Sequence, residues 1–165
     1  MLDKIRAELA PTGILRAGIN LSNFLLVTDK TPEGDPIGVS PDMARAVADR
    51  LDVRVKYITF ASPGELADAA VEDVWDIGNI GAEPERAKTI AFSAAYAEIE
   101  ATYLLPAGSL IQSVDEVDRE GVRIGVYGRS AYGLWLADNI KNAELVKTDG
   151  VDASFDIFVE QGLEV

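Results

Sequence analysis

The chain has no cysteine and no histidine among its 165 residues. Without cysteine, neither a disulfide framework nor thiol chemistry is available. Without histidine, the chain lacks the commonest general base and a frequent ligand of transition metals. We therefore expect no tightly bound metal ion.

Long apolar runs and basic residues are also scarce. No uninterrupted apolar stretch approaches the roughly 18 residues that cross a bilayer. Residues 1–11 mix charged with apolar positions, unlike the continuous apolar core of a secretory signal. The chain has 15 lysines and arginines but 28 acidic residues, which gives a formal net charge of −13. This balance argues against nucleic acids and anionic membranes as partners, because both bind a basic face.

Hydrophobic residues make up 48% of the chain and follow the periods of strands and helices. Strands that alternate with helices over crossovers of this length predict an α/β fold, with parallel sheets flanked by helices. We find no internal repeat at the periods of solenoid proteins. The predicted strands cover residues 14–20, 54–60, 76–82, 122–127 and 144–147, and the predicted helices cover 1–10, 41–51, 63–75, 131–140 and 153–161.

Local signals set several boundaries. Ser40 is predicted as an N-cap with Pro41 at the first helical position, and Met43, Val47 and Leu51 are predicted on the inner face of that helix. The stretches 62–65 and 113–116 have the pattern of capping boxes. The helix that begins after the first of them is predicted to turn residues 66, 70 and 74 inward. Glu98/Glu100 are interpreted as exposed strand residues, and Asp115/Glu116 as capping residues, rather than as acid–base pairs.

The most informative stretch runs from Asp76 to Tyr96. A strand of small and apolar residues enters a turn, where Pro84 suits the first position of a short helix. Arg86 follows two residues later, placed to reach back over the strand end. A planar guanidinium is the group suited to bidentate capture of a carboxylate.

This stretch, with its Glu85-Arg86-Ala-Lys88 block, precedes Phe92-Ser93 and the run 98–108. Upstream lies the block 38–51, and downstream lies 122–132, a strand that enters a Gly/Ser turn. In this order the chain resembles the type II periplasmic solute-binding proteins of ABC transporters, in their amino-acid-binding family 3, over about residues 12–165. The resemblance implies a type II periplasmic binding protein fold with two lobes, at 1–105 and 106–165. The chain is expected to stop partway through the second lobe.

Ligands of open α/β sheets bind outside the carboxyl ends of the strands. Three turns qualify, after residues 20, 82 and 127. The resemblance implies that Arg86 holds a ligand carboxylate and that Ser130 contacts it from the second lobe, although an N-cap role explains Ser130 equally well. Asn79 and Gly81 occupy the positions of the family's Gly-x-Thr pair. The threonine hydroxyl that would contact the ligand is therefore missing here. The full set of predicted ligand-binding residues is Asn23, Phe24, Asn79, Gly81, Arg86, Arg129, Ser130 and Ala131.

The resemblance implies a non-catalytic binding protein for a small carboxylate-bearing, amino-acid-like solute, acting by hinge closure. It also implies a periplasmic location, an ABC transporter permease as partner, and no cofactor. Cyclohexadienyl dehydratases resemble the same family, so an enzyme is the alternative. No acidic residue at the three turns stands out as a proton donor, and we therefore assign no catalytic residue.

An incomplete second lobe leads to one further expectation. It would leave sheet edges and apolar faces uncovered within one chain. Exchange of identical elements between two copies would cover them, with residues 104–108 as the hinge. The sequence therefore predicts a domain-swapped homodimer, or a module of this kind without a transport function.

Overall fold

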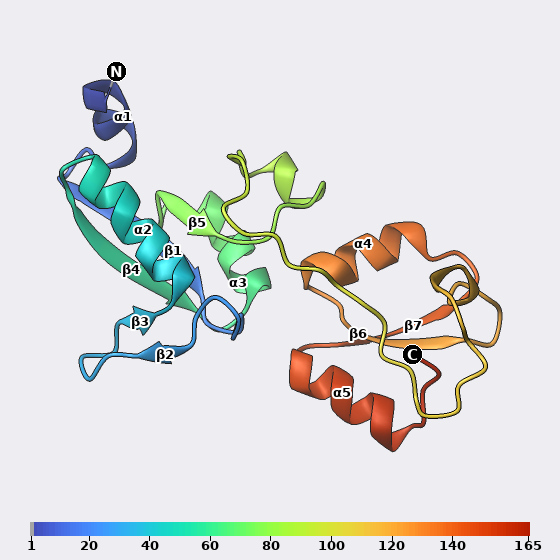
Figure 1. Ribbon diagram of the computed structural model, residues 1–165. Helices are drawn as coiled ribbons and strands as arrows, with labels where there is room; N and C mark the ends of the chain where they lie inside the picture. The colour runs from blue at the N-terminus through green and yellow to red at the C-terminus, as the bar shows by residue number, and fades with distance from the viewer. Residues whose placement is uncertain (1) are drawn as a thin grey trace. The chain divides into compact units, whose positions relative to one another are not determined.

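A computed structural model describes residues 2–165, which form two compact units (Figure 1). Unit 1 extends as far as Ala82 and takes in Arg86–Ala91, whereas unit 2 consists of Glu83–Glu85 and Phe92–Val165. The main division thus falls near residue 91, upstream of the boundary predicted after residue 105. Among the residues described, no helix is long and apolar enough to cross a membrane.

Unit 1 is built on a three-stranded parallel sheet with the strand order β4-β1-β5. Ile14 of β1 lies opposite Arg54 of β4, and Ala17 lies opposite Ile77 of β5. Two short strands, β2 and β3, form an antiparallel hairpin. The elements of unit 1 are α1 (Leu2–Leu9), β1 (Ile14–Asn20), β2 (Asp29–Lys30), β3 (Pro36–Ile37), α2 (Val39–Arg50), β4 (Arg54–Phe60), α3 (Pro63–Asp68) and β5 (Ile77–Asn79), with 3₁₀ turns at Ala69–Val71 and Arg86–Lys88.

Helix α2 covers one face of this sheet through small side chains. Ala44 and Ala48 are each 1% exposed and pack with Ala17 and Leu15 of β1. The predicted inner face is therefore wrong at Met43, which is exposed. Two alanines let the helix axis approach the sheet, and the longer Met43 side chain is left outside the contact.

Helix α3 covers the other face, above two glycines. A β-carbon added to Gly18 or Gly78 would lie 3.1–3.2 Å from the side chains of Leu66 or Trp75. The Trp75 indole N–H also donates to the Leu66 carbonyl at 3.2 Å. The helix predicted to reach residue 75 ends at Asp68 with a 3₁₀ turn to Val71, because the chain must turn back to lay Trp75 over the glycines.

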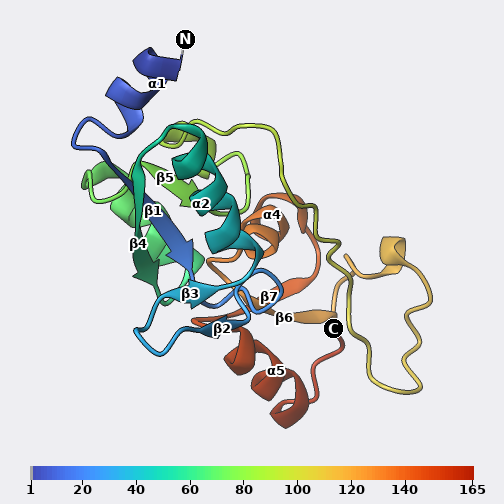
Figure 2. The ribbon, with the colours of Figure 1, turned by 60° about the vertical axis from the view of Figure 1, so that its left-hand side comes forward.

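Unit 2 repeats a strand–helix–strand–helix succession (Figure 2). Strands β6 and β7 are parallel, with Arg123 opposite Glu144. After the second helix, Val165 runs beside β6: its N–H donates to the Arg123 carbonyl (3.1 Å), and its carbonyl accepts from the Gly125 N–H (2.9 Å). The elements are β6 (Arg123–Tyr127), α4 (Ala131–Asn139), β7 (Glu144–Thr148) and α5 (Val151–Glu160), with a 3₁₀ turn at Val114–Glu116.

The core of unit 2 lies between β6 and α4, where Ile124 and Val126 pack with Leu136. Residues 91–106 form neither helix nor strand. Glu98 and Glu100 are therefore exposed but not strand residues, because no strand among residues 2–165 pairs with them.

Two capping predictions have different outcomes. The Ser62 hydroxyl accepts from the Glu65 N–H at 3.1 Å, and the Glu65 carboxylate accepts from the Ala61 N–H at 3.0 Å, so Ser62 is confirmed as the N-cap of α3. Ser113 makes no side-chain cap, and only a 3₁₀ turn follows it. There Glu116 accepts from the Gln112 N–H at 2.6 Å, one residue before Ser113, so the second capping box does not form.

Candidate functional site

The loop after β1 is shaped by asparagine side chains and carbonyls. The Asn20 side-chain oxygen accepts from the Ser22 N–H (3.1 Å) and from its hydroxyl (2.8 Å). The Asn23 carbonyl accepts from the Leu26 N–H at 3.0 Å. The next residue, Phe24, is 68% exposed. The predicted ligand residues Asn23 and Phe24 therefore lie in an ordered turn at the carboxyl end of the unit 1 sheet.

The start of α2 packs directly against this loop. Gly38, not Ser40, is the N-cap, with φ at +139°. A β-carbon at Gly38 would lie 2.4 Å from the Leu26 carbonyl oxygen, so only glycine fits. Ser40 lies inside the first turn, and its carbonyl accepts from the Asn79 side-chain amide at 2.8 Å. Asn79 thus ties the end of β5 to the start of α2.

Arg86 lies close to the same sheet edge. Its side chain is almost fully buried, with 5% exposure for the residue. One guanidinium nitrogen donates to the Gly81 carbonyl at 2.8 Å, and the Arg86 carbonyl accepts from the Ile90 N–H at 2.9 Å. The segment opened by Pro84 is a 3₁₀ turn rather than the predicted helix, and it folds the guanidinium back onto the strand end.

In unit 2, the turn after β6 is capped by a buried serine. The Ser130 hydroxyl donates to the Tyr127 carbonyl at 2.7 Å and accepts from the Gly133 N–H at 2.9 Å. It is therefore the N-cap of α4. Arg129 is exposed and Ala131 is half-buried. Because the Ser130 hydroxyl proton already has an acceptor, the N–H groups of the first helical turn are the donors that best suit an anion here.

The predicted residues thus lie at the carboxyl ends of the strands in two separate sheets. Asn79 is the last residue of β5, four others follow β1 or β5 of unit 1, and three follow β6 of unit 2. All eight thus lie at or after the carboxyl end of a parallel strand, as expected for an open α/β sheet. Within residues 2–165, no group of three or more acidic side chains could hold a metal ion.

Three residues that support the loops at the carboxyl end of the unit 1 sheet were not among the predicted ligand-binding residues. Asn20 orders the first loop, Gly38 permits its contact with α2, and Ser40 receives Asn79 through its main chain. A glycine directly before a helix with proline near its start was the one signal available for this contact.

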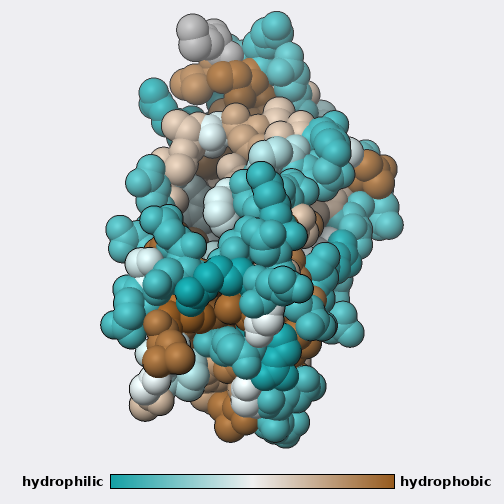
Figure 3. All heavy atoms as spheres, turned by 90° about the vertical axis from the view of Figure 1, so that its right-hand side faces the viewer, coloured by the Kyte–Doolittle hydropathy of each residue, from teal (hydrophilic) through white to brown (hydrophobic). Residues whose placement is uncertain are grey.

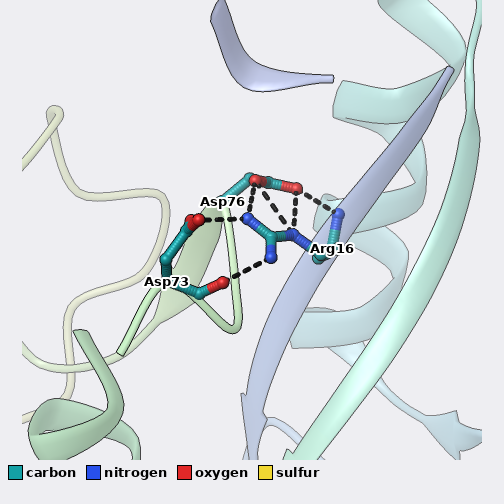
Figure 4. Close-up of polar contacts among 3 residues, drawn as sticks. All are labelled: Arg16, Asp73 and Asp76. Carbon is teal, nitrogen blue, oxygen red and sulfur yellow. Dashed lines mark hydrogen bonds and ion pairs between the residues drawn. The ribbon is translucent and has the colours of Figure 1, made fainter. Parts of the chain in front are cut away.

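An ion cluster stabilises the opposite end of the unit 1 sheet, near the amino end of β5 (Figure 4). The Arg16 guanidinium lies 2.6 Å from the Asp76 carboxylate and 2.8 Å from that of Asp73. The Arg16 backbone N–H donates to the same Asp76 carboxylate at 2.7 Å. These hydrogen bonds, with Asp76 first, raise the pKa of Arg16 above its ordinary value. The cluster joins β1 to the start of β5, so its role is structural.

Unit 2 has an equivalent pair at the start of β6. The Arg123 backbone N–H donates to the Glu164 carboxylate at 3.0 Å, and its guanidinium lies 2.9 Å from that carboxylate. The hydrogen bond from the Arg123 side chain lowers the pKa of Glu164 to about 2. Arg-x-Gly thus occurs in the first strand of each sheet, within β1 and at the start of β6, and an acidic residue beside that strand holds the arginine.

Comparison with known sequences agrees with this architecture. Residues 16–159 match the profile of the bacterial extracellular solute-binding proteins, family 3. No curated protein sequence matches the chain significantly.

Solved structures share the fold at low sequence identity. An ancestral amino acid-binding protein, described as a precursor of cyclohexadienyl dehydratase, is 21% identical, with a TM-score of 0.73 over 99% of this chain and 71% of its own. An ABC transporter binding component from Wolinella succinogenes, complexed with lysine, is 19% identical, with a TM-score of 0.69 over 93% and 66%. The arginine-bound form of a truncated arginine-binding protein from T. maritima is 19% identical, with a TM-score of 0.63 over 98% and 74%. The chain thus spans about two thirds to three quarters of each neighbour.

Proposed function

Because the chain belongs to the bacterial extracellular solute-binding proteins of family 3, we propose that it binds a small amino-acid-like solute through the solute's carboxylate. The observation that carries this proposal is Arg86, a nearly buried guanidinium at the carboxyl end of a parallel sheet. Such a group binds a planar anion through parallel charge-assisted hydrogen bonds. Asn79 and the Asn23–Phe24 turn supply amide and aromatic groups from the same edge, and the turn at 129–131 supplies donors from unit 2.

The proposed mechanism is ligand-selected closure of a hinge that joins the two units. It ends in delivery of the solute to an ABC transporter outside the cytoplasmic membrane. Neighbours that carry lysine or arginine make cationic amino acids the first solutes to screen. A fall in the radius of gyration on adding solute, measured by small-angle X-ray scattering, would support closure. An unchanged radius at saturation would contradict it.

Calorimetry with the best solute of that screen tests the role of Arg86. Arg86→Ala should cost about 2–5 kcal/mol of binding free energy, because a desolvated charged contact is lost. Arg86→Lys should recover only part of this, because an ammonium cannot make the bidentate contact. Arg54→Ala is the matched control, since Arg54 is exposed at the opposite edge of the same sheet. A change of less than about threefold, or 0.65 kcal/mol, for Arg86→Ala would refute the assignment.

The enzymatic alternative is kept because one structural neighbour is described as a precursor of a dehydratase. It has a direct test, which is turnover of prephenate or arogenate by the purified chain. Turnover that Arg86→Ala abolishes would replace the binding function by catalysis. Solute binding without turnover would support the binding function.

The homodimer predicted from the sequence also stays a prediction. The observation that favours it is a set of large apolar side chains exposed on unit 2, including Trp135 (54%), Phe155 (57%) and Val159 (60%). Burying such side chains drives association. Light scattering should then give twice the 17.7 kDa chain mass. A folded monomer at micromolar concentration would contradict the prediction.

A further inference from the structure

Polar side chains cover much of the face that Figure 3 shows, between apolar patches. A different set of polar contacts lies partly buried inside unit 1, where it joins β4, α2 and β5. The Tyr57 hydroxyl of β4 donates to the Pro41 carbonyl of α2 at 3.1 Å. The Asn79 side-chain amide of β5 donates to the carbonyl of the preceding residue of α2, Ser40, at 2.8 Å. The two strands that flank β1 therefore bind successive carbonyls in the first turn of one helix.

Tyr57 is itself held in place by α2 and the sheet. The Arg45 guanidinium carbon lies 5.7 Å from the centre of the Tyr57 ring, within the range of a cation–π contact. Arg45 follows Pro41 by four residues, so both lie on the same side of the helix. The ring also packs against the buried cluster that contains Ala17 and Ala44. Desolvation by this partial burial raises the pKa of Tyr57 above its ordinary value of 10.0, so the hydroxyl keeps its proton and donates at neutral pH.

The first turn of α2 depends on such contacts, because its N-cap, Gly38, supplies no side-chain hydrogen bond. The Ser40 N–H donates to the Leu26 carbonyl at 3.0 Å, which ties the turn to the loop after β1. The Ser40 carbonyl is bound by Asn79 from β5. The bond from Tyr57 to the next carbonyl holds the same turn from β4, a third direction. A shift of this turn would therefore carry the Ser40 carbonyl with it.

Asn79 is the residue through which this arrangement reaches the candidate site. It is the last residue of β5, at the carboxyl end of the sheet. It lies opposite Ile19 of β1 in the register, so its side chain is on the face that α2 covers. Because its amide donates to the Ser40 carbonyl, the orientation of the amide follows the position of that carbonyl. A binding group must be held within about 0.5 Å of its productive position, so a small shift of α2 is enough to weaken its contact.

We propose that Tyr57 is a positioning residue of the solute site, because it holds the first turn of α2, which in turn orients Asn79 for its contact with the solute. The inference rests on the proposed function, since Asn79 has this role only where unit 1 binds a solute. The positioning itself is a property of the free protein and can be measured without solute. Failure of the proposed function and failure of this inference are therefore distinguishable.

The first test uses the full chain without solute. Tyr57→Phe removes the hydroxyl but keeps a ring beside Arg45. The side-chain amide of Asn79, assigned by its disappearance in Asn79→Ala, should then exchange its protons with water about threefold to tenfold faster in proton–nitrogen correlation spectra, the range for one weakened hydrogen bond. Tyr103→Phe is the matched control, because Tyr103 is a half-buried tyrosine of unit 2, and it should leave this rate unchanged. An unchanged rate in Tyr57→Phe would overturn the proposal.

The second test measures solute affinity by calorimetry in a double-mutant cycle, with L-arginine or whichever amino acid binds best in the screen. Tyr57→Phe should weaken binding about threefold. In an Asn79→Ala background it should change binding less than about 1.5-fold, because the hydroxyl acts through Asn79. Independent effects that multiply in the double variant, or no effect of Tyr57→Phe on affinity, would overturn the proposal. Faster exchange of the Asn79 amide in a chain that binds no amino acid would support the positioning and refute the proposed function.

Discussion

Unit 1 and unit 2 build similar sheets but cover them differently. Each begins with a strand bearing Arg-x-Gly, returns through a helix to a parallel neighbour, and brings a third segment to the other side of the first strand. In unit 1 the sheet is closed by Ala44 and Ala48 on one face and by Leu66 on the other, all at most 1% exposed. In unit 2, α5 has no buried residue, and Trp135 and Phe155 face a groove.

The difference shows that strand order alone does not complete a core. Small residues at the helix–sheet contact of unit 1 allow close approach and exclude solvent. The larger side chains of unit 2 line a groove instead. We therefore expect unit 1 to be the more stable of the two.

Core truncation should give the largest contrast between the units. Leu15→Ala in unit 1 should cost about 3–5 kcal/mol of unfolding free energy, because its site is fully enclosed. Leu136→Ala in unit 2 should cost nearer about 2 kcal/mol, because its site borders the groove. Urea unfolding followed by Trp75 for unit 1 and Trp135 for unit 2, in single-tryptophan backgrounds, measures both. Equal losses of unfolding free energy would show that the groove does not lower the cost of the cavity left by Leu136→Ala.

Replacing Arg16 of unit 1 or Arg123 of unit 2 should give a smaller difference in unfolding free energy between the units. Arg16→Ala leaves the Asp76 side chain, which is 11% exposed, without its charged partner. This should cost about 1–3 kcal/mol, the range for a buried group left unsatisfied. Arg123→Ala should cost less, because the Glu164 side chain is 38% exposed and can be hydrated. The same two tryptophan reporters apply, and a larger loss for Arg123→Ala would contradict this ranking.

Acidification should produce the smallest effect, and it should be confined to unit 2. The pKa of Glu164 is lowered from 4.5 to about 2 by its bond to Arg123. A lowered pKa in the folded state stabilises unit 2 fully above pH 4.5, and this stabilisation is lost as the pH falls toward 2. Glu164→Gln should therefore flatten the decline in stability across this window, as reported by Trp135. Glu160→Gln, an exposed change on α5, should leave the decline intact.

Much of the backbone could be predicted from local patterns. The strands Ile14–Asn20 and Arg54–Phe60 have the bounds that their apolar periods indicate, and Ser62 caps α3. These features depend on neighbours in sequence, so the pattern carries the information. The position of Arg86 after a strand of small residues also favours the proposed carboxylate site.

Tertiary packing decided what neighbours in sequence do not encode. Met43 has a pattern as good as that of Ala44, but Ala44 packs between α2 and the sheet and Met43 is exposed. Glu98 and Glu100 have the pattern of a strand, yet no neighbouring strand pairs with them among residues 2–165. Ser130 could have been a cap or a ligand contact, and its hydroxyl bonds to Tyr127 and Gly133. The sequence by itself thus determined where chains extend and coil, because those preferences are local. The fold decided which side chains are buried and which strands pair, because these depend on segments far apart in the chain.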